Sequence, residues 1–539
     1  MECYKAIPEL VRRQGIGAVF GMLGAANAPW VAHGAELGAF RFIKTRHEET
    51  SVHAAIGYSR ASGDLGVCTV TRGPGFANSL NGLIVAAYGH VPVLMIVSQS
   101  PVDPTKAGYT EQNVDQEGFS ALLGAGFHHV VSPDQLEDRF WKAVRLACLM
   151  GRPQVLSLAD GLLEDTVELS TEVPSLEATL APDAGTVREV VDLLESASQP
   201  LILAGQGAVL ADCHSELVEL AELTGARVAA TLRAHRFFSG HPQDLGLAGT
   251  WAPPILRSYF QKSDVVVAFG ASLNDKTTDR RQLFGGASIA QCEVNENRPV
   301  RASRPELALL GDARLTAQAL IDQWKARGLE RRPAPDAPPP HSRVKASVLE
   351  VSMNHDPDRG LDLRQVYAAM DDQLPEDRIV VTDSGRSLGT LPAIITARDA
   401  RSWLVGRGYG TVGLGLGTAI GAAVAQPERP VTLFCGDGGF MMALAALDTV
   451  RMSGLDLTVV IMNDEQLGSE VQHLRRFSLP LDVIRQPLPD IGELAHTFGG
   501  FGQTVRTVED LAELKVPRGG LHLIDARLDP EVSGHAVLG

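Results

Sequence analysis

The sequence predicts an α/β protein of three successive domains, each built on a mainly parallel sheet. Short apolar runs that end in Gly, Asp or Asn recur along the chain, and such runs are typical of strands buried on both faces. They alternate with longer helix-like stretches, as between GVCTVT (66–71) and PVLMIVS (92–98). In sheets of this kind, ligands bind at the carboxyl ends of the strands. We therefore look for functional residues there.

Two irregular segments divide the chain of 539 residues into three parts of similar size. The first, residues 164–185, is acidic and contains two prolines, and the second, RRPAPDAPPPHSRV (331–344), is rich in proline. Such compositions favour an extended linker. We therefore expect an N-terminal domain over residues 1–165, a central domain over 185–325 and a C-terminal domain over 358–539.

The composition excludes several classes of function. The chain has 48 basic and 64 acidic residues, a net charge of −16 and no basic run, so it lacks the positive surface that nucleic acids and anionic membranes require. The longest apolar stretch is interrupted by Gly89, His90 and Pro92 and is too short to span a bilayer. There is no signal-peptide pattern and no paired cysteine motif. We expect a cytoplasmic protein with no nucleic-acid or membrane partner.

The segment from Cys435 to Glu470 carries the strongest functional signal. One apolar run leads into GDGG (436–439), a helix is predicted through residues 444–450, and a second apolar run ends at Asn463 and Asp464. Glycines let backbone N–H groups approach phosphate oxygens, and a helix N-terminus favours their negative charge. A carboxylate at each of two neighbouring strand ends suits Mg²⁺. The segment therefore predicts a diphosphate and metal site.

With this segment the sequence resembles the thiamine-diphosphate-dependent enzymes of the acetolactate synthase and pyruvate decarboxylase family. The family's GDG…N motif corresponds to residues 436–438 with 463–464. RHEETSVHAAIGYSRASG (46–63) and VTRGPGFAN (70–78) resemble its His-Glu helix and GPG turn, and GYGTVGLGLGTAIGAAVA (408–425) resembles its glycine-rich segment. The resemblance implies thiamine diphosphate, Mg²⁺, a 2-oxo acid or related carbonyl substrate, and a homodimer or homotetramer. It also implies that the N-terminal domain binds the pyrimidine and that the C-terminal domain binds the diphosphate and the metal.

The same resemblance assigns the metal ligands and the cofactor contacts. Asp437 and Asp464 are expected to bind the metal by their side chains, and Gln466 by its backbone carbonyl. The family usually has Asn where this chain has Asp464, so Asn463 is an alternative ligand, although a carboxylate is the better ligand for a hard cation. The cofactor-binding residues are expected to be Glu48, Asn78, Gly385, Arg386, Ser387, Gly410, Val412, Gly436, Asp437, Gly438, Gly439, Asp464, Leu467 and Gly468.

Two of these positions depart from the family pattern. Acetolactate synthases carry a Gln-His pair after the strand RIVVTD, where this chain has Arg386 and Ser387. Either residue could contact the diphosphate instead, and the alternative is an exposed loop arginine. Val412 takes the place of the bulky apolar residue that bends the cofactor. Valine is smaller but stiff at χ1, and its alternative role is plain packing.

Four residues are the candidates for catalysis. Glu48 matches the family's glutamate that bonds the far ring nitrogen of the aminopyrimidine and thereby helps it to accept the thiazolium proton. Gln112 matches a glutamine that faces the reacting carbonyl. Glu470 stands where pyruvate decarboxylases carry a catalytic glutamate, at the predicted start of a helix that favours the charged form, whereas burial would favour the neutral acid. Arg72 could clamp an anionic substrate group, or alternatively form an ion pair with Glu49 or a surface contact.

The leading hypothesis is a thiamine-diphosphate- and Mg²⁺-dependent 2-oxo acid decarboxylase or carboligase that resembles acetolactate synthase. One alternative is a lyase or hydrolase of C–C bonds in a dione or 2-hydroxyacyl compound, and another is a non-catalytic homologue that binds the cofactor. GQGAVL (205–210) lacks the third glycine of a dinucleotide fingerprint. The family's central domain binds FAD in some members, so FAD is allowed here but not favoured.

Overall fold

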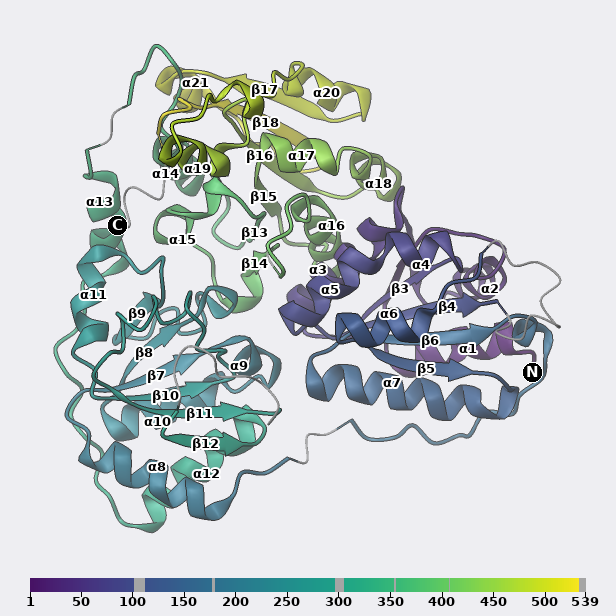
Figure 1. The fold of residues 1–539 in the computed structure, drawn as a ribbon, viewed down its shortest axis with the longest axis horizontal. Coiled ribbons are helices and arrows are strands. Elements are labelled where there is room, and N and C mark those ends of the chain that lie inside the picture. The colour runs from purple at the N-terminus through teal and green to yellow at the C-terminus, as the bar shows by residue number, and fades with distance from the viewer. Residues whose placement is uncertain (101–111, 177–179, 296–304, 353–354, 407, 533–539) are drawn as a thin grey trace.

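The computed structural model describes residues 1–100, 112–176, 180–295, 305–352, 355–406 and 408–532. They form three α/β units, each with one six-stranded sheet, and every strand pairing within these sheets is parallel. In Figure 1 the N-terminal unit (purple and blue) and the central unit (teal) lie side by side below the C-terminal unit (green and yellow). The predicted fold class is confirmed.

The N-terminal unit has the strand order β2-β1-β3-β4-β6-β5. Its central strands are buried along their whole length, as the apolar run in β4 predicts. The strands are β1 Ala18–Gly21, β2 Arg41–Lys44, β3 Gly66–Val70, β4 Val93–Gln99, β5 Gly126–Val130 and β6 Gln154–Ala159. The helices are α1 Cys3–Arg13, α2 Ala28–Glu36, α3 Glu48–Ser62, α4 Pro74–Asn78, α5 Leu80–Gly89, α6 Gln116–Leu123, α7 Leu136–Met150 and the 3-10 turns η1 Pro133–Gln135 and η2 Leu162–Glu164.

The central unit has the strand order β12-β11-β10-β7-β8-β9. Its strands are β7 Pro200–Ala204, β8 Arg227–Ala230, β9 Asp244–Leu247, β10 Val265–Phe269, β11 Ser288–Glu293 and β12 Leu307–Leu310. Its helices are α8 Ala184–Ser196, α9 Gln206–Leu210, α10 His214–Thr224, α11 Pro254–Gln261, α12 Ala313–Ala326 and the 3-10 turn η3 Leu232–Ala234. No helix or strand follows until α13, His341–Leu349, which begins inside the segment 331–344 that we predicted as an extended linker.

The C-terminal unit has the strand order β14-β13-β15-β16-β18-β17. Its strands are β13 Ile379–Thr382, β14 Trp403–Val405, β15 Val431–Gly436, β16 Leu457–Asn463, β17 Phe501–Val505 and β18 Leu521–Arg527. Its helices are α14 Leu363–Gln373, α15 Leu391–Ile394, α16 Gly415–Ala425, α17 Asp437–Met442, α18 Ala446–Ser453, α19 Val471–Arg476, α20 Ile491–Thr497, α21 Val508–Glu513 and the 3-10 turns η4 Arg386–Leu388, η5 Ala400–Ser402, η6 Gly468–Glu470 and η7 Asp482–Ile484.

Two helices follow GDGG, α17 and α18, with a break over residues 443–445, and the predicted helix through 444–450 corresponds to α18, which begins at Ala446. The first begins at Asp437, directly at the end of β15. The second buries Leu447 and Val450 in the core. The break therefore lets α17 follow the functional strand end while α18 packs its apolar face on the sheet.

Helices α3 and α16 join the N-terminal and C-terminal units. Figure 1 shows them where the two units meet. Their backbones approach so closely that an added Cβ at Gly57 would lie 2.0 Å from the carbonyl oxygen of Thr418, and one at Gly421 would lie 1.9 Å from that of Ala54. One hydrophobic cluster accordingly contains side chains of both helices and both sheets. The two units therefore share a core.

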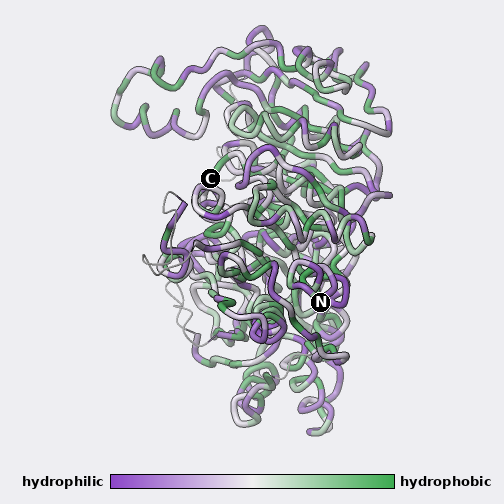
Figure 2. Tube along the Cα trace, turned by 90° about the vertical axis from the view of Figure 1, so that its right-hand side faces the viewer, coloured by the Kyte–Doolittle hydropathy of each residue, from purple (hydrophilic) through white to green (hydrophobic). Residues whose placement is uncertain are grey.

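Figure 2 shows the hydropathy of the chain, in which hydrophobic stretches alternate with hydrophilic ones. Across the residues that the structure describes, no helix has both the length and the apolar character needed to cross a membrane.

Candidate active site

A cavity of about 150 Å³ lies at the carboxyl ends of β15 and β16 in the C-terminal unit. The sheet places these strands side by side, so GDGG at one end and Asp464 at the other converge. Twelve of the predicted residues line this cavity, namely Gly385, Arg386, Val412, Gly436, Asp437, Gly438, Gly439, Asp464, Gln466, Leu467, Gly468 and Glu470. Tyr367 and Ser384 line it as well and were not predicted.

Asp437 is a buried carboxylate whose second oxygen has no hydrogen-bond partner. Its side chain lies at the start of α17, and the residue is only 4% exposed. Its Oδ1 accepts a hydrogen bond from the backbone N–H of Gly438 at 2.8 Å, whereas Oδ2 has no hydrogen-bond partner among the described residues. Burial, followed by the charge of Asp464, raises the pKa of Asp437 to about 7. A buried acceptor left in this state is suited to a cation.

Asp464 forms a buried ion pair with Arg386. Arg386 Nη2 lies 2.5 Å from Asp464 Oδ2, and the side chains are 9% and 6% exposed. Arg386 also donates to the carbonyl oxygen of Pro530 at 3.0 Å, which fixes the guanidinium at the cavity wall. Burial raises the pKa of Asp464, and the charge of Arg386 opposes that rise. The arginine is thus neither exposed nor free in this structure.

Asn463, the alternative metal ligand, does not line the cavity. It is 1% exposed, and its amide nitrogen donates to Asp525 Oδ1 at 2.8 Å. Its amide oxygen accepts from the backbone N–H of Glu465 at 3.1 Å, and Glu465 turns the chain with a φ of 52°. Both ends of the amide are therefore used inside the protein. The backbone oxygen of Gln466 accepts from Gly468 N–H at 2.9 Å and keeps one lone pair for a cation.

Asp383 anchors the glycine-rich loop beside the cavity. It follows β13 directly and accepts hydrogen bonds from Ser384 N–H at 2.6 Å and Gly413 N–H at 2.9 Å. Burial raises its pKa to about 6. The loop brings Val412 to the cavity wall, while Gly410, with a φ of 94°, does not line it. Sequence reasoning missed Asp383, although it ends the strand RIVVTD just as Asp464 follows β16.

In the N-terminal unit, Glu48 and Asn78 are brought together. Glu48 is the first residue of α3 and is 9% exposed. Asn78 Nδ2, from the end of α4, donates to Glu48 Oε2 at 3.0 Å. The helix begins there because the side chain of His47 accepts the backbone N–H of Glu49 as an N-cap. The glutamate thereby has a fixed position at the end of the N-terminal sheet.

Arg72 and Gln112 are also brought together. Arg72 Nε donates to Gln112 Oε1 at 3.1 Å, and its Nη1 lies 2.6 Å from Asp160 Oδ1. The alternative that paired Arg72 with Glu49 is wrong, because Asp160 takes that place at the end of β6 and Glu49 instead accepts a hydrogen bond from Asn81. Part of the charge of Arg72 is therefore already balanced.

The N-terminal candidates do not line the C-terminal cavity within one chain. One link between the two units runs from Thr411 Oγ1 to Asn81 Oδ1 at 3.2 Å, and Asn81 in turn donates to Glu49. Glu470 is exposed at the cavity rim and directly precedes α19, where its side chain makes no capping hydrogen bond. Ser387 is part of η4, and its side chain lies outside the described residues.

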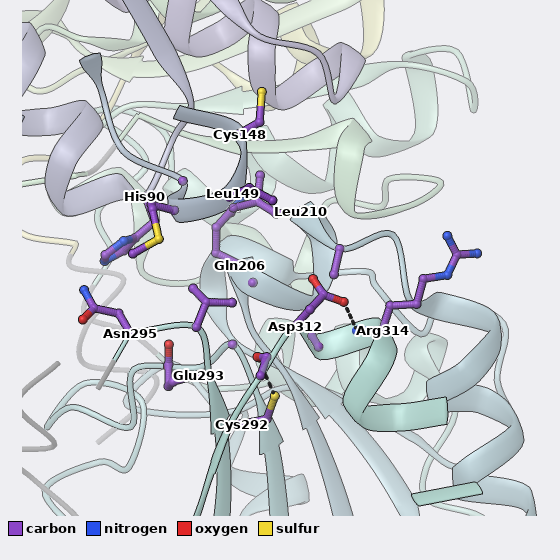
Figure 3. A pocket seen from close by; sticks show the side chains of 18 of the residues that line it. His90, Cys148, Leu149, Gln206, Leu210, Cys292, Glu293, Asn295, Asp312 and Arg314 are labelled. Carbon is purple, nitrogen blue, oxygen red and sulfur yellow. Dashed lines mark hydrogen bonds between the residues drawn. The ribbon is translucent and has the colours of Figure 1, made fainter. Parts of the chain in front are cut away.

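A second and larger cavity, of about 590 Å³, lies between the N-terminal and central units and was not predicted. Figure 3 shows Cys148 and Leu149 on one side and Glu293, Asp312 and Gln206 on the other. Beside it, the backbone N–H of Gly207 donates to the carbonyl oxygen of Gly270 at 3.1 Å. The glycines of GQGAVL thus let the segments after β7 and β10 pack closely together. The expectation that the central unit binds no FAD stays a prediction.

The fold and the acidic cavity define a class of α/β enzymes with functional groups at the strand ends of the last unit. The chain belongs to the thiamine pyrophosphate enzymes, which take their name from a synonym of thiamine diphosphate. The family's N-terminal TPP binding domain matches residues 1–119, its central domain residues 187–320 and its C-terminal TPP binding domain residues 383–517.

Known relatives match over nearly the whole chain. A probable acetolactate synthase large subunit of Methanocaldococcus jannaschii is 26% identical over 98% of this chain and 92% of its own length. The acetolactate synthase isozyme 2 large subunit of Escherichia coli is 28% identical over 96% of this chain and 94% of its own length. An acetolactate synthase of Arthrospira platensis is 26% identical over 98% of this chain and 93% of its own length. The prediction of a thiamine-diphosphate-dependent enzyme is confirmed.

Proposed function

We propose that this enzyme uses thiamine diphosphate and Mg²⁺ to decarboxylate a 2-oxo acid, and that it joins the product to a second carbonyl compound or releases it. The observation that carries this proposal is the acidic cavity, in which Asp437 Oδ2 has no hydrogen-bond partner among the described residues. The names of the relatives, all acetolactate synthases, support the same reaction class.

The chemistry of the cavity fits the metal and the diphosphate. Asp437 and Asp464 offer carboxylate oxygens and Gln466 a backbone oxygen, the ligand type that Mg²⁺ prefers. Within the described ranges, no three His, Cys, Asp or Glu side chains gather as a self-sufficient metal site. The proposed cation would therefore take its remaining oxygens from the diphosphate and water, with Gly438 and Gly439 next to the phosphates.

When bound, thiamine diphosphate supplies a carbon nucleophile and an electron sink for loss of carbon dioxide. Glu48, held by Asn78, would keep a proton at the aminopyrimidine ring. Val412 would shape the cofactor from the loop that Asp383 anchors. Gln112 and Arg72 would orient the substrate, and Glu470 would exchange a proton with the product.

We further propose that two copies of the chain complete each site. Glu48 and Asn78 do not line the cavity of their own chain, so a partner copy would bring them to it, in a homodimer or a homotetramer. Apolar side chains near the cavity support this proposal, because Met442 is 72%, Leu467 42% and Val412 37% exposed. Exposed apolar side chains that gather beside a binding site are typical of protein–protein contact surfaces. The domain bounds 1–165, 185–325 and 358–539, and a cytoplasmic location, remain part of this proposal.

Removal of the metal tests the proposal. Protein dialysed against EDTA at mildly alkaline pH should lose bound thiamine diphosphate, and Mg²⁺ with cofactor should restore it. A screen of 2-oxo acids with detection of carbon dioxide, aldehyde and coupled product then identifies the reaction. Full activity in metal-free protein would contradict the metal site. If the enzyme releases carbon dioxide from none of the 2-oxo acids but cleaves a dione, the proposed reaction is contradicted and a lyase or hydrolase is favoured.

A further inference from the structure

The buried ion pair between Arg386 and Asp464 places a fixed positive charge inside the proposed metal and diphosphate site. Arg386 Nη2 and Asp464 Oδ2 are 2.5 Å apart, and both residues line the cavity together with Asp437. These are also positions at which the sequence departs from its resemblance to the family. Two departures that meet as a pair of opposite charges have a common physical explanation, namely charge compensation within one cavity.

Resting on the proposed function, we propose that Arg386 is a positioning residue that makes the metal and the diphosphate bind together. Without a diphosphate, the guanidinium occupies Asp464 and competes with a divalent cation for it. When the diphosphate enters, it offers the guanidinium a new and bidentate acceptor. Asp464 is then released to the cation, so each ligand improves the affinity for the other.

The surroundings hold the guanidinium at this point of the cavity. Arg386 Nη1 donates to Pro530 O at 3.0 Å, so the side chain is fixed from the outer side. An added Cβ at Gly468 would lie 2.6 Å from Asp464 Oδ2 and 3.0 Å from Arg386 Nε. A side chain at this position would have to displace one member of the pair. The pair is therefore built into the cavity wall and is not a surface contact.

The charges of the cavity give the direction of the effect. Asp437 and Asp464 carry two negative charges when ionised, and Arg386 offsets one of them. A cation that binds alone must break a buried ion pair, and this costs free energy because the guanidinium loses its partner. A cation that arrives with a diphosphate does not leave the guanidinium unpaired. Binding of either ligand alone should therefore be weak.

The test measures binding of Mn²⁺ and of inorganic pyrophosphate, separately and together, without any turnover. Free Mn²⁺ is counted by electron paramagnetic resonance, and pyrophosphate binding is measured by calorimetry. In the wild-type protein, pyrophosphate should tighten Mn²⁺ binding at least about fivefold. In Arg386→Gln, Mn²⁺ alone should bind more tightly than to wild type, and pyrophosphate should add little. Arg386→Gln combined with Asp464→Asn, which removes both charges, shows whether the two effects depend on each other.

Arg527→Gln is the matched control. Arg527, at the end of β18, forms an ion pair with Glu465, which follows Asp464 in the chain, with 2.5 Å between Nη1 and Oε1. Arg527 does not line the cavity. This variant should keep the wild-type coupling. Arg386→Lys keeps the positive charge but lacks the planar guanidinium, and it replaces Arg386→Gln in the test if that variant does not fold. It should show weaker coupling between Mn²⁺ and pyrophosphate binding than wild type.

The outcomes separate the inference from the proposed function. If wild-type protein binds neither Mn²⁺ nor thiamine diphosphate, the proposed function fails. If it binds both, but Arg386→Gln and Arg386→Lys keep wild-type Mn²⁺ affinity and coupling, the inference is overturned and the ion pair only stabilises the fold.

Discussion

At the scale of single residues, Glu48 has the geometry of a proton-holding group, because it is nearly buried and receives one hydrogen bond from Asn78. Glu48→Gln should lower turnover by more than about tenfold, that is by more than about 1.4 kcal/mol in the barrier, and spare cofactor binding. The amide keeps the shape but cannot share a proton. Steady-state rates and calorimetric cofactor affinity check this. Glu49→Gln is the control, and near-normal turnover in Glu48→Gln would make Glu48 structural.

Asp437 predicts how the stability of metal-free protein depends on pH. Its pKa is raised from 3.8 to about 7, so between these values the folded protein holds a proton that the unfolded chain has released. The free energy of unfolding therefore falls as pH rises through this window and is constant above it. This fall in the free energy of unfolding is at most about 4 kcal/mol. Asp437→Asn should not show it, because the amide stays neutral at every pH.

Urea unfolding in EDTA at pH 5 and pH 8 measures the difference. The free energy of unfolding of Asp437→Asn minus that of wild type should be larger at pH 8 than at pH 5. An equal difference at both values would mean that Asp437 does not titrate in this window.

At the scale of elements, the contact between α3 and α16 depends on glycines. A Cβ at Gly421 would lie 1.9 Å from the Ala54 oxygen and 2.5 Å from the Tyr58 nitrogen, both backbone atoms. Gly421→Ala must therefore push the helices apart and should cost about 1–3 kcal/mol. Thermal unfolding checks this, with Gly286→Ala as the control because no atom lies within 4 Å of its added Cβ. An unchanged midpoint in Gly421→Ala would contradict the close crossing.

Elements also mark how far the sequence could predict the molecule. Buried parallel strands show as continuous apolar runs, and the residues that follow them must lie at one edge of a sheet, so Asp437 and Asp464 could be placed near each other. The break between α17 and α18 was missed because Leu444, which lies in it, keeps helical spacing with Leu447 and Val450. The pairing of Arg386 with Asp464, and of Arg72 with Asp160, could not be predicted. Sequence spacing gives the strand end but not the rotamer or the neighbour there.

At the scale of the whole molecule, a site shared between two copies predicts complementation. Glu48→Gln and Asp437→Ala proteins should each be inactive, but mixed subunits should form dimers with one intact site. Random exchange would restore roughly a quarter of wild-type activity. Mixing Glu48→Gln with Asn78→Ala is the control and should restore nothing, since both lie on the same unit. No recovery after proven subunit exchange would contradict a shared site.

The core shared by α3 and α16 also has a consequence for synthesis on the ribosome. About 350 residues separate the end of α3 from the start of α16. At 5–20 residues per second, the nascent N-terminal unit waits roughly 20–70 s for the helix that covers α3. During that interval Ala54, Gly57 and Tyr58 lack their partners from α16. The nascent chain is then a target for chaperones, and the first third reaches its final stability only when the last third has been made.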